Sequence, residues 1–160
     1  MKDKIAFLDR DGVLIFEPKN TFQVDRLDLL EILPGVIESL KDLMSRGFKL
    51  VLVSNQDGLG TESFPREAFD GPQNKMLEIF KDNGVSFEAT CICPHFPTEN
   101  CDCRKPKLGI VEEFLKNHDV DLENSFMYGD RETDRRFAQN LGIRFIKTET
   151  NQTCSLTQLL

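Results

Sequence analysis

Short apolar runs of strand length alternate along this chain with longer segments in which apolar residues recur at helical spacing. The first two runs are apolar almost without interruption, as expected of strands whose two faces are both covered by helices. This alternation predicts the α/β class, with a parallel sheet flanked by helices. The predicted strands are residues 4–8, 49–53, 87–92, 125–128 and 143–147.

The segments between these strands have the apolar period of amphipathic helices. The clearest spans residues 34–47, where a proline stands near the start and a glycine at the end. In residues 69–84, the pair Gly71 and Pro72 predicts a kink or a break into two pieces. Two further helices are expected around residues 110–115 and 137–141.

The length of 160 residues suits one domain. We find no internal repeat and no linker, so residues 1–150 are predicted to form one domain that includes a metal-binding loop at residues 91–105. Residues 151–160 are polar and then rich in leucine, without a clear period. We expect them to be a tail, which either docks on the domain or is a cut end.

The charge balance excludes some classes of partner. The chain has 20 Lys and Arg against 27 Asp and Glu, a net charge of -7. This sign argues against general binding to nucleic acid or to anionic membranes. The apolar runs are also too short to span a bilayer or to form the core of a signal peptide. We therefore expect a cytoplasmic protein that acts on a small molecule.

Polar residues follow the predicted strands at the edge where parallel sheets bind ligands. Asp9 and Asp130 are placed to share a hard cation such as Mg²⁺. A phosphate between that cation and Lys105 would have its charge offset on both sides, while Ser54 and the backbone N–H of Asn55 supply further donors. Each residue alone also suits a turn or a helix cap. Their occurrence in order after successive strands favours phosphoryl chemistry.

Asp9 and Asp11 suit two different chemical roles. A carboxylate bound to a divalent cation stays ionised and can attack as a nucleophile. A second carboxyl two residues further on, away from the metal, can hold a proton near neutral pH. We therefore expect Asp9 to be the nucleophile and Asp11 the acid and base.

Four short motifs resemble those of the haloacid-dehalogenase-like phosphatases. The sequence DRDGVL at residues 9–14 resembles the first motif, and Ser54, Lys105 and the pair Gly129-Asp130 resemble the second, third and fourth. The resemblance covers nearly the whole chain and implies a Rossmann-like sheet. It implies that Asp9 forms an aspartyl-phosphate, that Asp11 protonates the leaving oxygen and then activates water, and that Mg²⁺ binds Asp9, Asp130 and the backbone carbonyl of Asp11.

A separate cluster of metal-binding residue types lies in one short loop. Three thiols and an imidazole are the ligand set of a closed tetrahedral Zn²⁺ site, which is structural because no coordination position stays open. The alternatives are buried free thiols or a disulfide bridge from Cys91, which we assign to the interior of a strand. The predicted ligands are Cys93, His95, Cys101 and Cys103.

The loop that runs from these cysteines into Arg104-Lys105-Pro106 is similar to the branch containing the histidinol-phosphate and heptose bisphosphate phosphatases. Residues 22–25, 55–60 and 69–72 are similar to the histidinol-phosphate enzymes of histidine biosynthesis. The resemblance implies hydrolysis of histidinol phosphate, and a fused or associated imidazoleglycerol-phosphate dehydratase as a partner. The alternatives are a phosphatase for heptose or other sugar bisphosphates, and an inactive zinc-stabilised binding module.

Two acidic residues near the motifs have open roles. Glu17 lies shortly after the first motif, and we expect it to bind the ammonium of histidinol phosphate, the alternative being a solvated surface glutamate. Asp134 follows the fourth motif, where it either helps to bind the metal or lies at the N-terminus of a helix.

Overall fold

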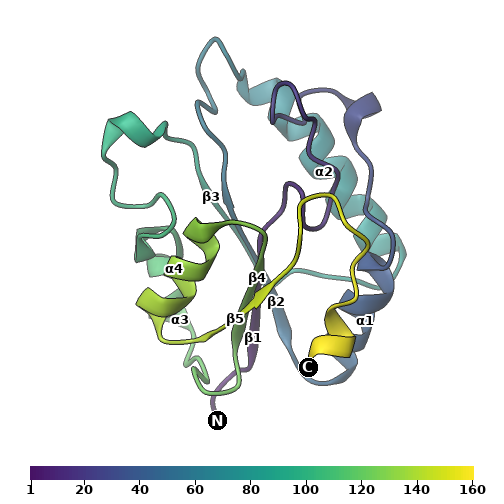
Figure 1. Ribbon diagram of the computed structural model, residues 1–160, viewed down its shortest axis with the longest axis vertical. Helices are drawn as coiled ribbons and strands as arrows, with labels where there is room; N and C mark the ends of the chain where they lie inside the picture. The colour runs from purple at the N-terminus through teal and green to yellow at the C-terminus, as the bar shows by residue number, and fades with distance from the viewer.

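Five parallel strands form one sheet, in the order β3-β2-β1-β4-β5 (Figure 1). The computed structural model describes residues 1–160. The strands are β1 (Ile5–Leu8), β2 (Lys49–Asn55), β3 (Ala89–Cys93), β4 (Phe126–Gly129) and β5 (Arg144–Lys147). This order is that of a Rossmann-like sheet. The predicted fold class is confirmed, and every predicted strand is present within two residues of its expected limits.

Helices cover both faces of the sheet (Figure 1). One face carries α1 (Val36–Ser45) and α2 (Arg66–Asp82), and the other carries α3 (Glu112–Asn117) and α4 (Glu132–Leu141). The short 3-10 helices are η1 (Leu27–Leu29), η2 (Pro97–Glu99), η3 (Leu108–Val111) and η4 (Leu156–Leu159). None of the helices combines the length and the apolar character needed to span a bilayer.

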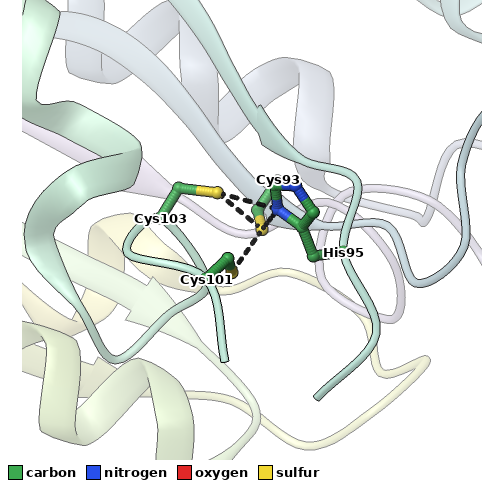
Figure 2. A group of neighbouring side chains, drawn as sticks. All are labelled: Cys93, His95, Cys101 and Cys103. Carbon is green, nitrogen blue, oxygen red and sulfur yellow. Dashed lines mark hydrogen bonds between the residues drawn. The ribbon is translucent and has the colours of Figure 1, made fainter. Parts of the chain in front are cut away.

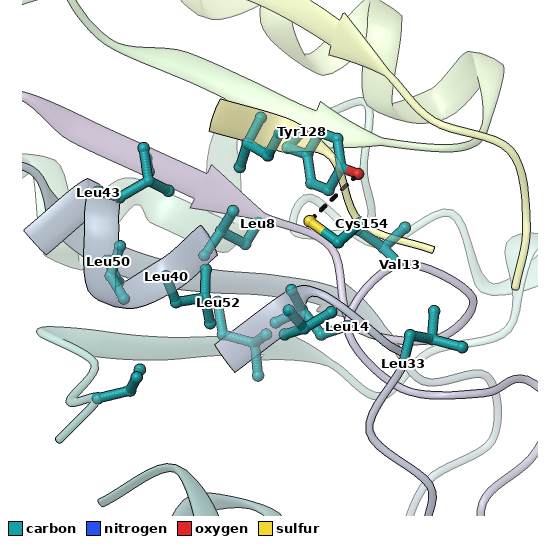
Figure 3. Packing of buried hydrophobic residues seen from close by; sticks show 14 of the residues in the cluster. Leu8, Val13, Leu14, Leu33, Leu40, Leu43, Leu50, Leu52, Tyr128 and Cys154 are labelled. Atoms are coloured by element: carbon teal, nitrogen blue, oxygen red, sulfur yellow. Dashed lines mark hydrogen bonds between the residues drawn. The ribbon is translucent and has the colours of Figure 1, made fainter. Parts of the chain in front are cut away.

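The alternation of side chains along the strands divides the interior into two cores. In β1, Ala6 and Leu8 point to the α1 and α2 side, whereas Ile5 and Phe7 point to the α3 and α4 side. The first core is the larger, with 20 buried residues against 11 (Figure 3). Because helices cover both faces of the sheet, side chains on both sides of a central strand are buried, and the strand is apolar along nearly its whole length.

One helix departs from its predicted form. A single helix, α2, runs through Gly71 and Pro72, so a break into two pieces is wrong. Proline lacks a backbone N–H and disfavours a helix interior by about 3 kcal/mol. The helix is held regardless by tertiary contacts, because Phe69, Met76 and Phe80 are buried.

The last residues of the chain dock on the domain rather than leaving it. The side chains of Cys154 and Leu156 belong to the larger core, and Figure 3 shows Cys154 against Tyr128. The backbone N–H of Cys154 donates to the carbonyl of Pro34 at 2.8 Å. The segment after β5 therefore first contacts the loops beyond the strand ends and then runs back along the α1 side of the sheet (Figure 1).

Candidate active site

A polar cleft of about 450 Å³ opens at the carboxyl ends of the strands. Only 3 of its 17 lining residues are hydrophobic, so it suits a polar ligand. The topology brings residues from distant parts of the chain to this edge. The predicted site residues that line the cleft are Asp9, Asp11, Glu17, Ser54, Asn55 and Lys105.

The turn after β1 requires a glycine. Gly12 has a φ of +79°, in the left-handed region that other residues rarely adopt. A Cβ here would lie 2.8 Å from Cγ2 of Thr150 and 2.9 Å from Oδ2 of Asp130. The close approach of these segments therefore excludes any side chain at position 12.

Lys105 lies at the centre of the buried charges. Its Nζ donates to Oδ1 of Asp9 at 3.1 Å, to Oδ1 of Asp134 at 2.7 Å and to the carbonyl of Val53 at 2.8 Å. Burial by itself would lower the pKa of Lys105, but the two carboxylates outweigh it and raise that pKa. The ammonium is therefore charged, as phosphate binding requires.

Asp134 lies at the N-terminus of a helix, which is one of the two roles expected from the sequence. Its Oδ2 accepts from the backbone N–H groups of Asp130 and Arg131, both at 3.2 Å, where α4 begins. Burial, reinforced by the nearby charge of Asp9, raises the pKa of Asp134 to about 6. The residue thus fixes the start of α4 and also belongs to the acidic group beside Lys105.

Three carboxylates form a site that suits a divalent cation. Oxygens of Asp9, Asp130 and Asp134 all lie within 4.8 Å of one another. Burial raises the pKa of Asp9, opposed by Lys105 and reinforced by Asp130. Oδ1 of Asp130 is buried without a hydrogen-bond partner, whereas its Oδ2 accepts from Thr150 at 2.6 Å. An unpartnered carboxylate oxygen beside other carboxylates is the donor set that Mg²⁺ prefers.

Asp11 lies outside this group of carboxylates. Its side chain contacts Arg10 and Gln56 instead. This separation agrees with the expectation of one carboxyl on the metal and one off it. The contribution of its backbone carbonyl to the metal stays a prediction.

Ser54 and Asn55 make contacts that the sequence did not indicate. The Oγ of Ser54, 1% exposed, accepts from Nε2 of Gln56 at 2.7 Å. The side chain of Asn55 binds the backbone of Lys105 twice, accepting from its N–H at 2.9 Å and donating to its carbonyl at 3.2 Å. Asn55 therefore holds the loop that carries Lys105.

The four predicted zinc ligands converge (Figure 2). Sγ of Cys93 lies 3.4 Å from Nδ1 of His95, 3.6 Å from Sγ of Cys101 and 2.9 Å from Sγ of Cys103. Ligands of a tetrahedral zinc with thiolate bonds lie roughly 3.8 Å apart, so these atoms need little movement to bind one ion. All five cysteines are free thiols, and none forms the alternative disulfide.

The acidity of one thiol suits metal binding. Some desolvation opposes ionisation of Cys101, but hydrogen bonds from the backbone N–H groups of Arg104 and Cys103 outweigh it and lower the pKa of Cys101 to about 6. Thiolates are the form that binds zinc. Since Cys103 is two residues before Lys105, an ion here would fix the loop that carries Lys105.

Glu17 is neither solvated nor free. The residue is 4% exposed and its carboxylate forms an ion pair with Arg131, so the surface alternative is wrong. Burial raises the pKa of Glu17 against the opposing charge of Arg131. Asn151 holds its backbone, accepting from the N–H of Glu17 at 2.7 Å and donating to its carbonyl at 3.1 Å. An ammonium ligand would have to share or displace Arg131.

Comparison with known proteins agrees with this geometry. The model of the family described as polynucleotide kinase 3 phosphatase matches residues 4–151. The histidine biosynthesis bifunctional protein HisB of Blochmanniella floridana is 50% identical over 92% of this chain, and that of Campylobacter jejuni subsp. doylei is 52% identical over 92%. The chain spans 41% and 42% of the length of these relatives.

A solved structure supports the same grouping. The D,D-heptose 1,7-bisphosphate phosphatase of B. bronchiseptica, complexed with magnesium and phosphate, superposes with a TM-score of 0.80 at 27% identity. The match covers 95% of this chain and 92% of that one. Because the family model matches residues 4–151 of the 160 in this chain, the chain belongs to the polynucleotide kinase 3 phosphatase family, within the haloacid-dehalogenase-like phosphatases.

Proposed function

We propose that the protein is a Mg²⁺-dependent phosphomonoester hydrolase that converts histidinol phosphate to histidinol and phosphate in histidine biosynthesis. The choice of substrate depends on one observation. About half of the residues, over 92% of the chain, are identical to those of bifunctional histidine biosynthesis proteins. The geometry supports the reaction type, because Asp9 and the buried Lys105 line a polar cleft, and oxygens of Asp130 and Asp134 lie within 4.8 Å of an oxygen of Asp9.

The residues of the cleft divide the reaction between them. Asp9 attacks phosphorus, so that its new P–O bond forms as the bond to the leaving oxygen breaks, and Asp11 gives that oxygen a proton. In the second half, Asp11 takes a proton from water, whose oxygen attacks phosphorus and returns the electron pair to Asp9. Lys105 offsets the negative charge of the phosphoryl group, and Ser54 with the backbone N–H of Asn55 supplies further donors.

Two metal ions are part of the proposal. Asp9, Asp130 and the backbone carbonyl of Asp11 would hold Mg²⁺, which when bound supplies positive charge beside the phosphoryl oxygens. The three thiols and the imidazole of the loop would hold a structural Zn²⁺ that fixes Lys105.

A partner domain follows from the relatives. They are named as bifunctional, and this chain spans about two fifths of their length. We therefore propose that the phosphatase works fused to, or associated with, an imidazoleglycerol-phosphate dehydratase.

The likeness to a heptose bisphosphate phosphatase favours a second candidate substrate, a sugar bisphosphate. The charges of the cleft argue against it. The three cationic residues of the lining are already paired: Lys105 with Asp9 and Asp134, Arg104 with Asp57, and Arg131 with Glu17. A second phosphate would need a free cation, whereas the amine of histidinol phosphate suits acidic walls.

Phosphate release from a panel of phosphomonoesters tests the proposal. Histidinol phosphate should have the highest kcat/KM, well above heptose bisphosphate. Asp9→Asn should lower turnover by at least about 10³, because an amide neither attacks phosphorus nor binds the metal as well. Near-normal turnover in a folded, metal-loaded Asp9→Asn sample would refute the mechanism, and a preference for the sugar bisphosphate would refute the substrate.

A further inference from the structure

Arg10 is a fully buried cation that the proposed reaction does not use. It stands between the two aspartates of the first motif and is 0% exposed. Its guanidinium lies over the ring of Phe69 in α2, with Cζ 4.9 Å from the ring centroid. A buried charge is costly unless it is paired and hydrogen-bonded, so its partners indicate what it is for.

The main partner of Arg10 is the carboxylate of Asp11. Nε donates to Oδ1 of Asp11 at 2.9 Å, and Nη2 lies 2.9 Å from the same oxygen. One whole edge of the guanidinium therefore faces Oδ1. The pair is buried on both sides, since the side chain of Asp11 is 10% exposed.

The other oxygen of Asp11 has a different neighbour. Oδ2 accepts from Nε2 of Gln56 at 2.8 Å. Nε2 also donates to Ser54, while Oε1 of Gln56 accepts from Nη2 of Arg10 at 3.3 Å. These three contacts fix which way the amide of Gln56 points, because rotating it by half a turn would set its oxygen against the carboxylate.

The two oxygens of Asp11 consequently differ in their capacity to hold a proton. A proton on Oδ1 would meet the N–H groups of Arg10. Oδ2 has one partner and keeps a second lone pair, in a residue that lines the cleft. Oδ2 is therefore the atom that can carry a proton without breaking the contacts with Arg10 and Gln56.

We propose that Arg10 and Gln56 are positioning residues for proton transfer, which hold Asp11 so that Oδ2 gives the proton to the leaving oxygen and later takes one from water. This inference rests on the proposed role of Asp11 as acid and base. In the first step the O–H bond at Oδ2 breaks as the leaving oxygen gains that proton and its P–O bond breaks. In the second step the proton lost by water returns to Oδ2.

The dependence of rate on the leaving group tests this role. Phenyl phosphate and p-nitrophenyl phosphate have similar shapes, but phenolate is the more basic leaving group and needs a proton more. The kcat/KM value reports the steps up to departure of the leaving group, where the acid acts. In Gln56→Met, kcat/KM for phenyl phosphate should fall about tenfold more than for p-nitrophenyl phosphate.

Gln73→Met is the matched control. Gln73 is another buried glutamine that binds Arg10, its Oε1 accepting from Nη1 at 2.8 Å, and it forms no hydrogen bond with Asp11. Its removal should keep the ratio of the two kcat/KM values within about twofold of the original protein. A ratio that changes equally in both variants would mean a general structural role and would overturn the inference.

Asp11→Asn separates this inference from the proposed function. If Asp11→Asn leaves the ratio of the two kcat/KM values unchanged, the proposed role of Asp11 fails. If Asp11→Asn changes the ratio and Gln56→Met does not, only the positioning role fails. When Gln56→Met is added to Asp11→Asn, the ratio should not change further, because the acid it positions is gone. A further tenfold change in the double variant would also overturn the inference.

Discussion

Replacing Lys105 by methionine removes the ammonium that three buried acceptors share. The side chain is 2% exposed, and those of its partners Asp9 and Asp134 are 10% and 1% exposed. Methionine has a similar length, so the change removes charge and hydrogen bonds with little loss of volume. Taking one partner from a buried ion pair typically costs about 3–5 kcal/mol, because the other charge stays buried alone. We expect a loss of this size in the free energy of unfolding.

The loss should depend on pH. With Lys105 present the pKa of Asp134 is about 6, and without the ammonium it rises further. The native state then holds a proton more tightly than the unfolded chain, so the stability of the variant falls as pH rises from about 4 through the raised native pKa. The difference between the two proteins should grow from pH 5.5 to pH 8, by up to about 1.4 kcal/mol for each unit by which removal of the lysine raises the pKa.

Urea unfolding measures this directly, in magnesium-free buffer without a chelator that would strip zinc. Thermal unfolding should also occur roughly 6–20 °C lower. Lys107→Met is the control, since Lys107 lies in the same loop and is exposed. Its effect should stay below about 0.5 kcal/mol. A loss below about 1 kcal/mol in Lys105→Met, or an equal loss at both pH values, would refute the reasoning.

Three further changes test other parts of the molecule. Cys103→Ser should lower zinc affinity at least about tenfold and reduce turnover, and full zinc content by elemental analysis with full activity would contradict the proposed site. Glu17→Gln should reduce kcat/KM for histidinol phosphate about tenfold, a loss of about 1.4 kcal/mol, while sparing phenyl phosphate, which lacks an amine. Equal effects on both substrates would exclude an amine contact. Leu156→Ala should cost about 2–5 kcal/mol in urea unfolding, since Leu156 is fully buried, and an unchanged stability would contradict docking of the last residues.

The positions of the strands along the chain and the place of the cleft could be predicted from local patterns. Apolar runs mark the strands, and the polar residue after each strand marks the binding edge. These patterns predict Asp9, Ser54 and Lys105 as residues of the candidate site. The Cys/His cluster could be predicted equally well, because its four residues lie within one short loop and their types suit one zinc ion.

The long-range hydrogen bonds and ion pairs that orient these side chains could not be predicted in the same way. Arg10 lies inside the first motif, and its bond to Gln73 joins residues 63 positions apart. Nothing periodic marks such a pair. Similarly, the sequence places Glu17 near the site but does not show that Arg131 already pairs with it, 114 positions further on. The break predicted at Pro72 is absent from α2 for the same reason, since long-range packing overrides the local preference of proline.

The segment after β5 shows what a purely local analysis omits. It has no period and no motif, yet Thr150 donates to Oδ2 of Asp130 and leaves Oδ1 as the unpartnered oxygen of the acidic group. Asn151, with a φ of +63°, binds the backbone of Glu17, which follows the first motif. The burial of Leu156 anchors both contacts. Orientation of a ligand by its outer neighbours is a large part of metal affinity. The segment after β5 therefore contributes to the candidate site, because Thr150 occupies one carboxylate oxygen of Asp130 and leaves the other for the proposed cation.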